Sequence, residues 1–260
     1  MNYETLRWEM DPAIATITLA RPEKRNAISG RMIEELLAAF EQAEKGAARV
    51  VILTGSGKAF CAGMDLEELQ GLAQQSRKEN LEDSRRMAAL FRHIHEFPHP
   101  VIAAVNGPAI AGGCGIATLA DFTLAAPEAK FGYTEVKIGF IPALVSVYLR
   151  RQIGDKRARD LLLTGRIISA EEALRLGLVT EIVPAEQLMA RARELAASLL
   201  SVSPTSIERT KHLLLRFDEK ETAEEIQLAI RANTEIRSTA DFREGLASFL
   251  EKRAPRWTGK

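Results

Sequence analysis

Cysteine is scarce in this sequence: Cys61 and Cys114 are the only two among 260 residues. Each stands beside glycine or alanine, and the pair has no metal-ligand spacing. Neither a disulfide framework nor a zinc site built from paired cysteines is therefore expected. Both are better interpreted as reduced, small core residues of an intracellular protein.

A net charge and long apolar runs are also missing. The 35 basic residues balance the 35 acidic ones, so nothing attracts a polyanion such as nucleic acid to the whole chain. The longest apolar stretches, such as Val101–Val105, are too short to span a bilayer. Residues 1–10 mix charged and apolar side chains, unlike a secretion signal. We expect a cytoplasmic protein that binds neither nucleic acid nor membrane.

What the sequence does have is apolar content, at 46% of its residues, arranged in alternating strand and helix patterns. Tyr3–Glu9 and Ala13–Leu19 predict a hairpin with its turn at Asp11-Pro12. Ser29 is expected to cap a helix with one apolar face, and Arg49–Leu53 then predicts a short buried strand. These elements together predict a β-α-β crossover.

The same order recurs further along the chain and then gives way to helices. A charged helical stretch from about Arg77 to Glu96 precedes a predicted buried strand at Val101–Val105. Gly112–Leu119 is expected to be helical and Phe122–Ala125 extended. Beyond Pro142 nearly everything has helical periodicity, with clear segments at Ile207–Leu215, Ala223–Asn233 and Phe242–Leu250.

The last of these helices has an apolar stripe that must be covered. The stripe follows Ser238-Thr239 and consists of Phe242, Leu246, Phe249 and Leu250. It either packs on its own core or forms a subunit interface. We predict an α/β core with the active site over residues 1–195 and a helical region over residues 196–260.

Two glycine-rich turns are the most informative segments. Residues 57–66 and residues 106–115 each follow a predicted strand and enter a predicted helix. Glycines allow bare N–H groups to approach a ligand, and a helix N-terminus adds unpaired donors. Two such turns can converge on one carbonyl oxygen as an oxyanion hole. Close packing or a phosphate cradle are the alternatives, although neither turn matches a dinucleotide-binding or P-loop motif.

Four segments together carry a resemblance to a known family. Arg21–Ala27 (RPEKRNA), Phe60–Leu66, Val105–Gly113 and Phe249–Pro255 (FLEKRAP) resemble the entrance motif, the two oxyanion segments and the C-terminal signature of the crotonase (enoyl-CoA hydratase/isomerase) superfamily. The resemblance covers nearly the whole chain. It implies a spiral of repeated β-β-α turns, a C-terminal helical region that covers the active site, and homotrimers that pair into hexamers.

The resemblance also implies a set of site residues. The oxyanion donors would be the amides of Met64 and Gly112, and no metal or separate cofactor is implied because coenzyme A is part of the substrate. The positions placed at substrate or coenzyme A are Lys24, Arg25, Ala27, Lys58, Ala59, Phe60, Ala62, Met64, Asp65, Leu66, Gly112 and Gly115. From the residues alone, Asp65 is expected to start a helix rather than to catalyse.

One catalytic carboxylate is expected, at Glu135. Many hydratases that this sequence resembles have two glutamates, but Gly115 occupies the first of those positions and only Glu135 the second. Without the resemblance, Glu135 would be interpreted as a glutamate that favours a helix dipole. A lone carboxylate near apolar walls can have a raised pKa and can take and return a proton. It can therefore serve hydration, by activating water, or isomerisation, by moving a proton from C2 to C4.

Hydration is the favoured activity, on an acyl-CoA thioester substrate. Ile141–Ser146 replaces a glycine-rich run common in the family and, with Gly115, resembles a bacterial subgroup of branched-chain, methylglutaconyl-type enoyl-CoA hydratases. Gly115 either leaves room for a larger or carboxylated acyl group or is a packing change. The 3,2-enoyl-CoA isomerase is the main alternative, followed by a decarboxylase, a thioester hydrolase, and a non-catalytic acyl-CoA-binding or RNA-binding protein.

Overall fold

The computed structural model describes residues 3–260 and begins with the predicted hairpin. Strands β1 (Leu6–Asp11) and β2 (Ile14–Leu19) pair antiparallel. The hydroxyl of Ser29 accepts a hydrogen bond from the Met32 amide at 3.2 Å and so caps α1 (Gly30–Lys45). The following strand, β3 (Val50–Gly55), lies parallel to β2, which confirms the crossover.

The main sheet has six strands in the order β1-β2-β3-β4-β6-β9. From β2 onwards all neighbours are parallel. Its remaining strands are β4 (Val101–Val105), β6 (Phe122–Ala125) and β9 (Glu181–Ile182). The first two of these match the predicted ranges, since continuous apolar runs are typical of strands covered on both faces.

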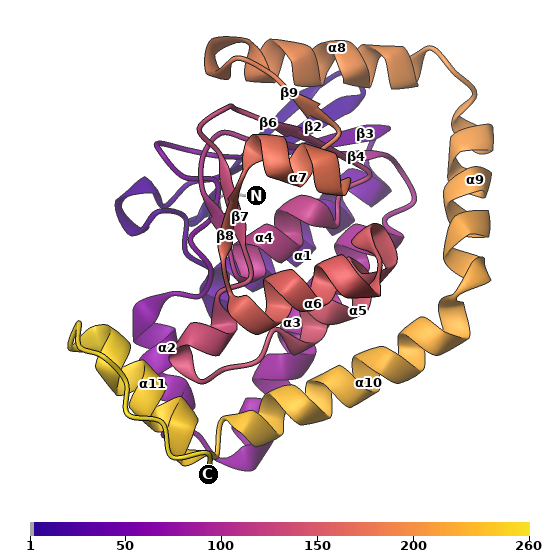
Figure 1. The fold of residues 1–260 in the computed structure, drawn as a ribbon. Coiled ribbons are helices and arrows are strands. Elements are labelled where there is room, and N and C mark those ends of the chain that lie inside the picture. Colours follow the sequence, from indigo (N-terminus) through magenta and orange to yellow (C-terminus); the bar gives the residue numbers. More distant parts are fainter. Residues whose placement is uncertain (1–2) are drawn as a thin grey trace.

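Helices cover both faces of this sheet. On β3, Val51 and Leu53 point into the main core, which α1 and α3 (Arg77–Glu96) complete. Val50 and Ile52 instead pack toward α8 (Leu188–Leu200), which lies across the strands in Figure 1. The alternation follows from the two-residue period of a strand.

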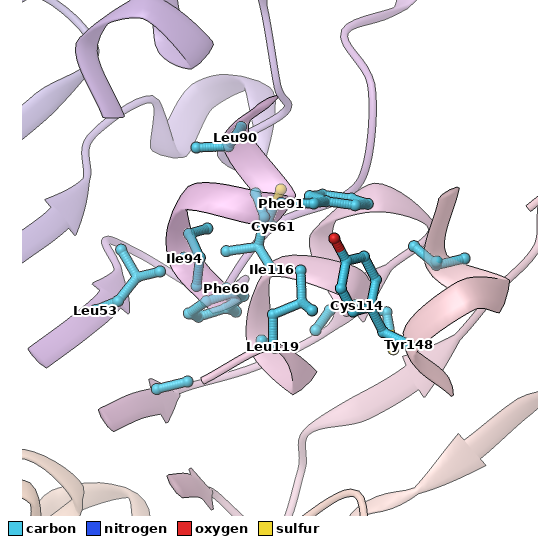
Figure 2. Packing of buried hydrophobic residues seen from close by; sticks show 14 of the residues in the cluster. Leu53, Phe60, Cys61, Leu90, Phe91, Ile94, Cys114, Ile116, Leu119 and Tyr148 are labelled. Carbon is cyan, nitrogen blue, oxygen red and sulfur yellow. The ribbon is translucent and has the colours of Figure 1, made fainter. Parts of the chain in front are cut away.

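The main core is rich in aromatic side chains and contains both cysteines. Figure 2 shows Phe60 and Phe91 beside Cys61 and Cys114 among the buried aliphatic residues. Both thiols are free and buried, as the sequence predicts, and burial raises the pKa of each to about 12. Neither is therefore a thiolate at neutral pH.

A second, three-stranded sheet was not predicted. It consists of β5 (Ala109–Ile110), β7 (Lys130–Gly132) and β8 (Ile167–Ser169), in the order β5-β7-β8. Strands of two or three residues are too short to show a periodicity in sequence. This sheet is nevertheless where the second glycine-rich turn meets the segment that leads to Glu135.

Helices make up most of the rest of the chain, as expected beyond Pro142, apart from the short β8 and β9. The remaining α-helices are α2 (Leu66–Leu72), α4 (Gly112–Thr118), α5 (Ala143–Ile153), α6 (Asp155–Thr164), α7 (Ala170–Leu176), α9 (Pro204–Phe217), α10 (Glu219–Ile236) and α11 (Ala240–Leu250). The 3-10 helices are η1 (Pro22–Lys24), η2 (Glu135–Ile138) and η3 (Ala185–Gln187). Within residues 3–260, no helix is long and apolar enough to cross a membrane.

The last helices wrap around the outside of the core (Figure 1). Helix α9 buries none of its residues, whereas α10 packs across α3 and α5. Helix α11 contacts η2 so closely that a Cβ atom on Gly245 would lie 2.3 Å from the carbonyl oxygen of Ile138. The apolar stripe is divided: Phe242 and Leu246 are buried in the chain's own core, while Phe249 is 52% exposed.

Candidate active site

Backbone hydrogen bonds join the two glycine-rich turns. The Ile110 amide donates to the carbonyl oxygen of Cys61 at 2.9 Å, and the Cys61 amide donates to that of Pro108 at 3.1 Å. Glycine is required where the turns touch: a Cβ on Gly113 would lie 2.5 Å from the Cys61 oxygen. Gly63 has φ +91°, and a Cβ on it would lie 3.1 Å from the carbonyl oxygen of Ile110. These contacts between the two turns place Met64 and Gly112 at one cavity.

The amides of Met64 and Gly112 both remain available as donors. Neither N–H donates to any acceptor within residues 3–260, and Gly112 is the first residue of α4. The residue before it, Ala111, adopts φ 50° and ψ −125°, a conformation that typically costs an L residue about 1–3 kcal/mol. A 2.7 Å hydrogen bond from the Ala111 amide to the Gly132 oxygen holds this strained turn against β7.

Glu135 lines the same cavity and is the first residue of η2, immediately beyond β7. Its side chain is buried, with the residue 8% exposed, and its Oε2 atom has no hydrogen-bond partner in the described part of the chain. Burial raises the pKa of this carboxyl from its ordinary value of 4.5 to about 7. A carboxyl with this pKa can both accept and return a proton near neutral pH.

The position of the missing second glutamate is filled by core side chains. A Cβ on Gly115 would lie 2.6 Å from Val145 Cγ1 and 2.9 Å from Phe91 Cζ. Phe91 and Val145 themselves line the cavity, so they occupy the volume that Gly115 gives up. This packing supports the interpretation of Gly115 as a packing change, and room for a larger acyl group stays an untested prediction.

Gly115→Ala is expected to lower the free energy of unfolding by about 1–3 kcal/mol, because the new methyl group overpacks the contact with Val145 and Phe91. Urea denaturation of the purified variant measures this. Gly71→Ala is the matched control, since a Cβ there meets nothing within 4 Å and glycine disfavours the α2 helix. Equal stability of Gly115→Ala and wild type would contradict the packing interpretation.

Charged side chains from the region of η1 and from the start of α2 meet on one side of the cavity. Asp65 accepts a hydrogen bond from the Glu67 amide at 3.0 Å and so caps α2, as predicted. It also binds Arg21 at 2.7 Å, while Lys24 lies 3.6 Å from Asp65 and 2.7 Å from Glu67. This side of the cavity therefore presents basic groups that are positioned by carboxylates.

Asn26 holds the turn after η1 in place, and it was not predicted as a site residue from the sequence. It is fully buried, with φ 54°, and its Nδ2 donates to the carbonyl oxygens of Ser56 and Ala59 at 2.9 and 2.8 Å. Its Oδ1 accepts from the Arg21 amide at 2.9 Å. The available signal was an asparagine within the Arg21–Ala27 motif, because asparagine tolerates the left-handed conformation of a turn.

The structure brings most of the predicted site residues to one cavity of about 890 Å³. Those that line it are Lys24, Arg25, Ala27, Ala62, Met64, Asp65, Leu66, Gly112 and Glu135. Lys58 is exposed outside this lining, and Ala59 and Phe60 are buried. Asn233 and Arg237 also line the cavity, although neither was singled out in the sequence. Within residues 3–260, no three His, Cys, Asp or Glu side chains form a metal-binding group.

Comparison with known proteins gives a consistent result. Residues 9–260 match the model of a family described as "Enoyl-CoA hydratase/isomerase". The chain is 44% identical over 245 residues to a "Putative enoyl-CoA hydratase" of Thermus thermophilus, covering 94% of this chain and 97% of the relative. It is 39% identical over 263 residues to a "Probable enoyl-CoA hydratase" of Rhodobacter capsulatus, covering 100% of both.

Solved structures agree with the sequence relatives. An enoyl-CoA hydratase/isomerase from Xanthobacter autotrophicus Py2 superposes with a TM-score of 0.90 at 28% sequence identity, covering 99% of this chain and 100% of that one. An enoyl-CoA hydratase from Mycobacterium avium subsp. paratuberculosis K-10 gives a TM-score of 0.87 at 27% identity, with coverage of 99% and 100%. The spiral α/β fold expected from the sequence is thus confirmed.

Proposed function

Because this chain belongs to the enoyl-CoA hydratase/isomerase family, we propose that it adds water across the 2,3 double bond of a 2-enoyl-CoA thioester. The proposal rests on one observation above all. Glu135, a buried carboxyl with one unpartnered oxygen, lines the same cavity as Met64 and Gly112. The amide N–H groups of these two residues have no acceptor within residues 3–260. Such a cavity can stabilise negative charge on a thioester oxygen and move a proton beside it.

In the proposed reaction the two amides donate to the thioester oxygen. The ionised Glu135 takes a proton from water as the water oxygen bonds to C3, and the double-bond electrons move onto the thioester oxygen to form an enolate. The protonated carboxyl then returns that proton to C2 as the enolate collapses. One carboxyl can serve both steps, because its pKa of about 7 makes neither protonation state costly at neutral pH.

The main alternative is an isomerase in which Glu135 moves a proton between C2 and C4. The absence of a second carboxyl at Gly115 favours it, since isomerisation needs no group to hold water. Incubation with panels of 2-enoyl-CoA and 3-enoyl-CoA in ¹⁸O-water, followed by mass detection, separates the two. Incorporation of label into the product without migration of the double bond supports the hydratase; migration without label would overturn it.

Coenzyme A would be held on the charged side of the cavity. We propose that its phosphates lie near Lys24 and Arg25, with the exposed Lys58 outside the cavity lining. Assembly into homotrimers or hexamers is also proposed. Helix α9 leaves Leu213, Leu214 and Phe217 exposed, which is typical of a surface that another subunit covers.

The rate of hydration should depend on pH through Glu135. The reactive form is the ionised carboxylate, and burial raises its pKa to about 7. We therefore expect kcat/KM to rise as the pH increases through about 7 and to level off above it. Initial rates with a 2-enoyl-CoA across the neutral range measure the profile. A rate that is constant across that range, or that falls as pH rises through it, would contradict the role of Glu135 as the base.

A further inference from the structure

Tyr133 is a buried ionisable side chain that the proposed reaction does not use. It lies between β7 and η2, two residues before Glu135, and it is 1% exposed. Within residues 3–260 it is not one of the residues that line the cavity, so it is not placed to touch a ligand there. Burial raises the pKa of its phenol well above the ordinary value of 10, so the hydroxyl stays protonated at neutral pH. A buried hydroxyl needs a hydrogen-bond partner, and that partner indicates its role.

The partner of Tyr133 is Thr118, the last residue of α4. The two hydroxyl oxygens lie 3.1 Å apart, and both residues are buried. Thr118 has one hydroxyl proton, which it donates to the carbonyl oxygen of Cys114 at 2.9 Å. The Tyr133 hydroxyl is therefore the donor to Thr118. The result is a directed chain of two hydrogen bonds that ends on the backbone of α4.

The C-terminal end of α4 is held in place independently of Tyr133. The carbonyl oxygen of Thr118 accepts a hydrogen bond from Gln152 Nε2 on α5. The carbonyl oxygen before it, that of Ala117, accepts from the Thr123 hydroxyl on β6 at 2.9 Å. Because these bonds join α4 to two other elements, Thr118 is a fixed point to which the Tyr133 side chain can be attached.

The bond from Tyr133 connects the two parts of the proposed catalytic site. Gly112, whose amide is proposed to bind the thioester oxygen, begins the helix that Thr118 ends. Glu135 lies on the other segment, two residues beyond Tyr133. Oε2 of Glu135 has no partner within residues 3–260, so the backbone that carries this side chain sets where the oxygen lies.

A backbone hydrogen bond joins the same two segments at the other end of α4. The Ala111 amide, immediately before the helix, donates to the oxygen of Gly132 at 2.7 Å. One such bond allows the segment beyond β7 to rotate about it. The bond from Tyr133 adds a second attachment, one helix length away, and so fixes the direction in which the chain leaves for Glu135.

We propose that Tyr133 is a positioning residue, whose hydrogen bond to Thr118 holds the Glu135 carboxyl in place relative to the Gly112 amide. This inference rests on the proposed function and deepens it, because it concerns the geometry of the same site. The position of the base matters most while bonds to C2 and C3 are changing. Loss of the hydrogen bond should therefore lower kcat and leave KM nearly unchanged.

Tyr133→Phe tests the inference, since it removes the hydroxyl and keeps the ring. Thr118 still donates to Cys114, so no buried donor loses its acceptor and the fold should be retained. We expect kcat for a 2-enoyl-CoA to fall about tenfold and KM to change by less than about twofold. The midpoint of the pH profile should stay at about 7, because burial sets the pKa of Glu135. Steady-state rates across the neutral range measure all three.

Tyr148→Phe is the matched control and should keep the wild-type kcat. Tyr148 is also buried, at 5% exposed, and within residues 3–260 it neither lines the cavity nor hydrogen-bonds through its hydroxyl. Thr118→Val removes the other side of the proposed bond, so it should lower kcat about as much as Tyr133→Phe. Thr118→Ser keeps a hydroxyl and should restore most of the rate. The double variant Tyr133→Phe with Thr118→Val should lose no more than either single one.

Four results would overturn the inference while the proposed function stands: a normal kcat in Tyr133→Phe, a rise in KM at unchanged kcat, additive losses in the double variant, and an equal loss in Tyr148→Phe. In each case the wild type still hydrates the 2-enoyl-CoA. Failure of the wild type to hydrate any 2-enoyl-CoA would overturn the proposed function together with the inference.

Discussion

Replacing Glu135 with glutamine is expected to lower turnover of a 2-enoyl-CoA by about 10²-fold or more. Glutamine has nearly the shape of glutamate but cannot accept and return the proton on which the proposed reaction depends. Steady-state rates of hydration with and without the substitution measure the effect. Glu128→Gln, at an exposed position of the same part of the chain, is the matched control and should keep normal turnover.

The same variant should gain stability at alkaline pH, which separates loss of chemistry from loss of structure. The pKa of Glu135 is 4.5 when the side chain is free and about 7 in the folded protein. Wild type therefore loses stability as pH rises from 4.5 through 7, up to roughly 3 kcal/mol, because ionisation is easier in the unfolded chain. Glu135→Gln does not ionise, so above pH 7 it should unfold at higher denaturant concentration. In the rate measurement, near-normal turnover by Glu135→Gln would contradict the catalytic role proposed for Glu135.

Gly112→Pro is expected to lower kcat by a factor on the order of 10²–10³. Proline has no N–H to donate and suits the first position of a helix, which Gly112 occupies in α4, but its ring adds strain at Ala111 before it, whose φ is 50° and ψ −125°. The substitution thus removes one of the two donors proposed for the thioester oxygen. The measurement is kcat with a saturating 2-enoyl-CoA, and thermal unfolding checks that the fold is retained.

Gly112→Ala is the control for this effect, since it adds a side chain and keeps the N–H. Its Cβ would lie 3.3 Å from Ile28 Cδ1, a tight contact with the terminal methyl group of a buried side chain. We expect a loss of less than about tenfold, and most of the difference between the two variants to be the missing donor. Equal losses in both variants would mean that the amide of Gly112 does not stabilise the reaction.

Long, strongly patterned elements of the fold could be predicted from the sequence. The bounds of α3, β4 and β6 agree with the expected ones, because an amphipathic helix of 20 residues and continuous apolar strands dominate their local sequence. The small second sheet could not be predicted. Its strands have two or three residues, and they are defined by pairings between distant segments, such as Ala109 with Phe131.

The candidate site, too, could be predicted from the sequence only in part. The glycine turns were visible because close backbone contact demands glycine at particular positions, as at Gly113. The partners of Gly115 were not visible, since Phe91 and Val145 reach it from other elements. Arg237 was also hidden: among 35 basic residues, nothing local distinguishes a buried arginine from an exposed one.

The close contact of η2 with α11 has a consequence for biosynthesis. Gly139 and Gly245 allow the two backbones to touch, and this contact supports the short helix that begins at Glu135. On the ribosome, the carboxylate proposed as the catalyst is translated long before α11, the helix that packs against it. We therefore expect the proposed site to be completed only after α11 has left the exit tunnel.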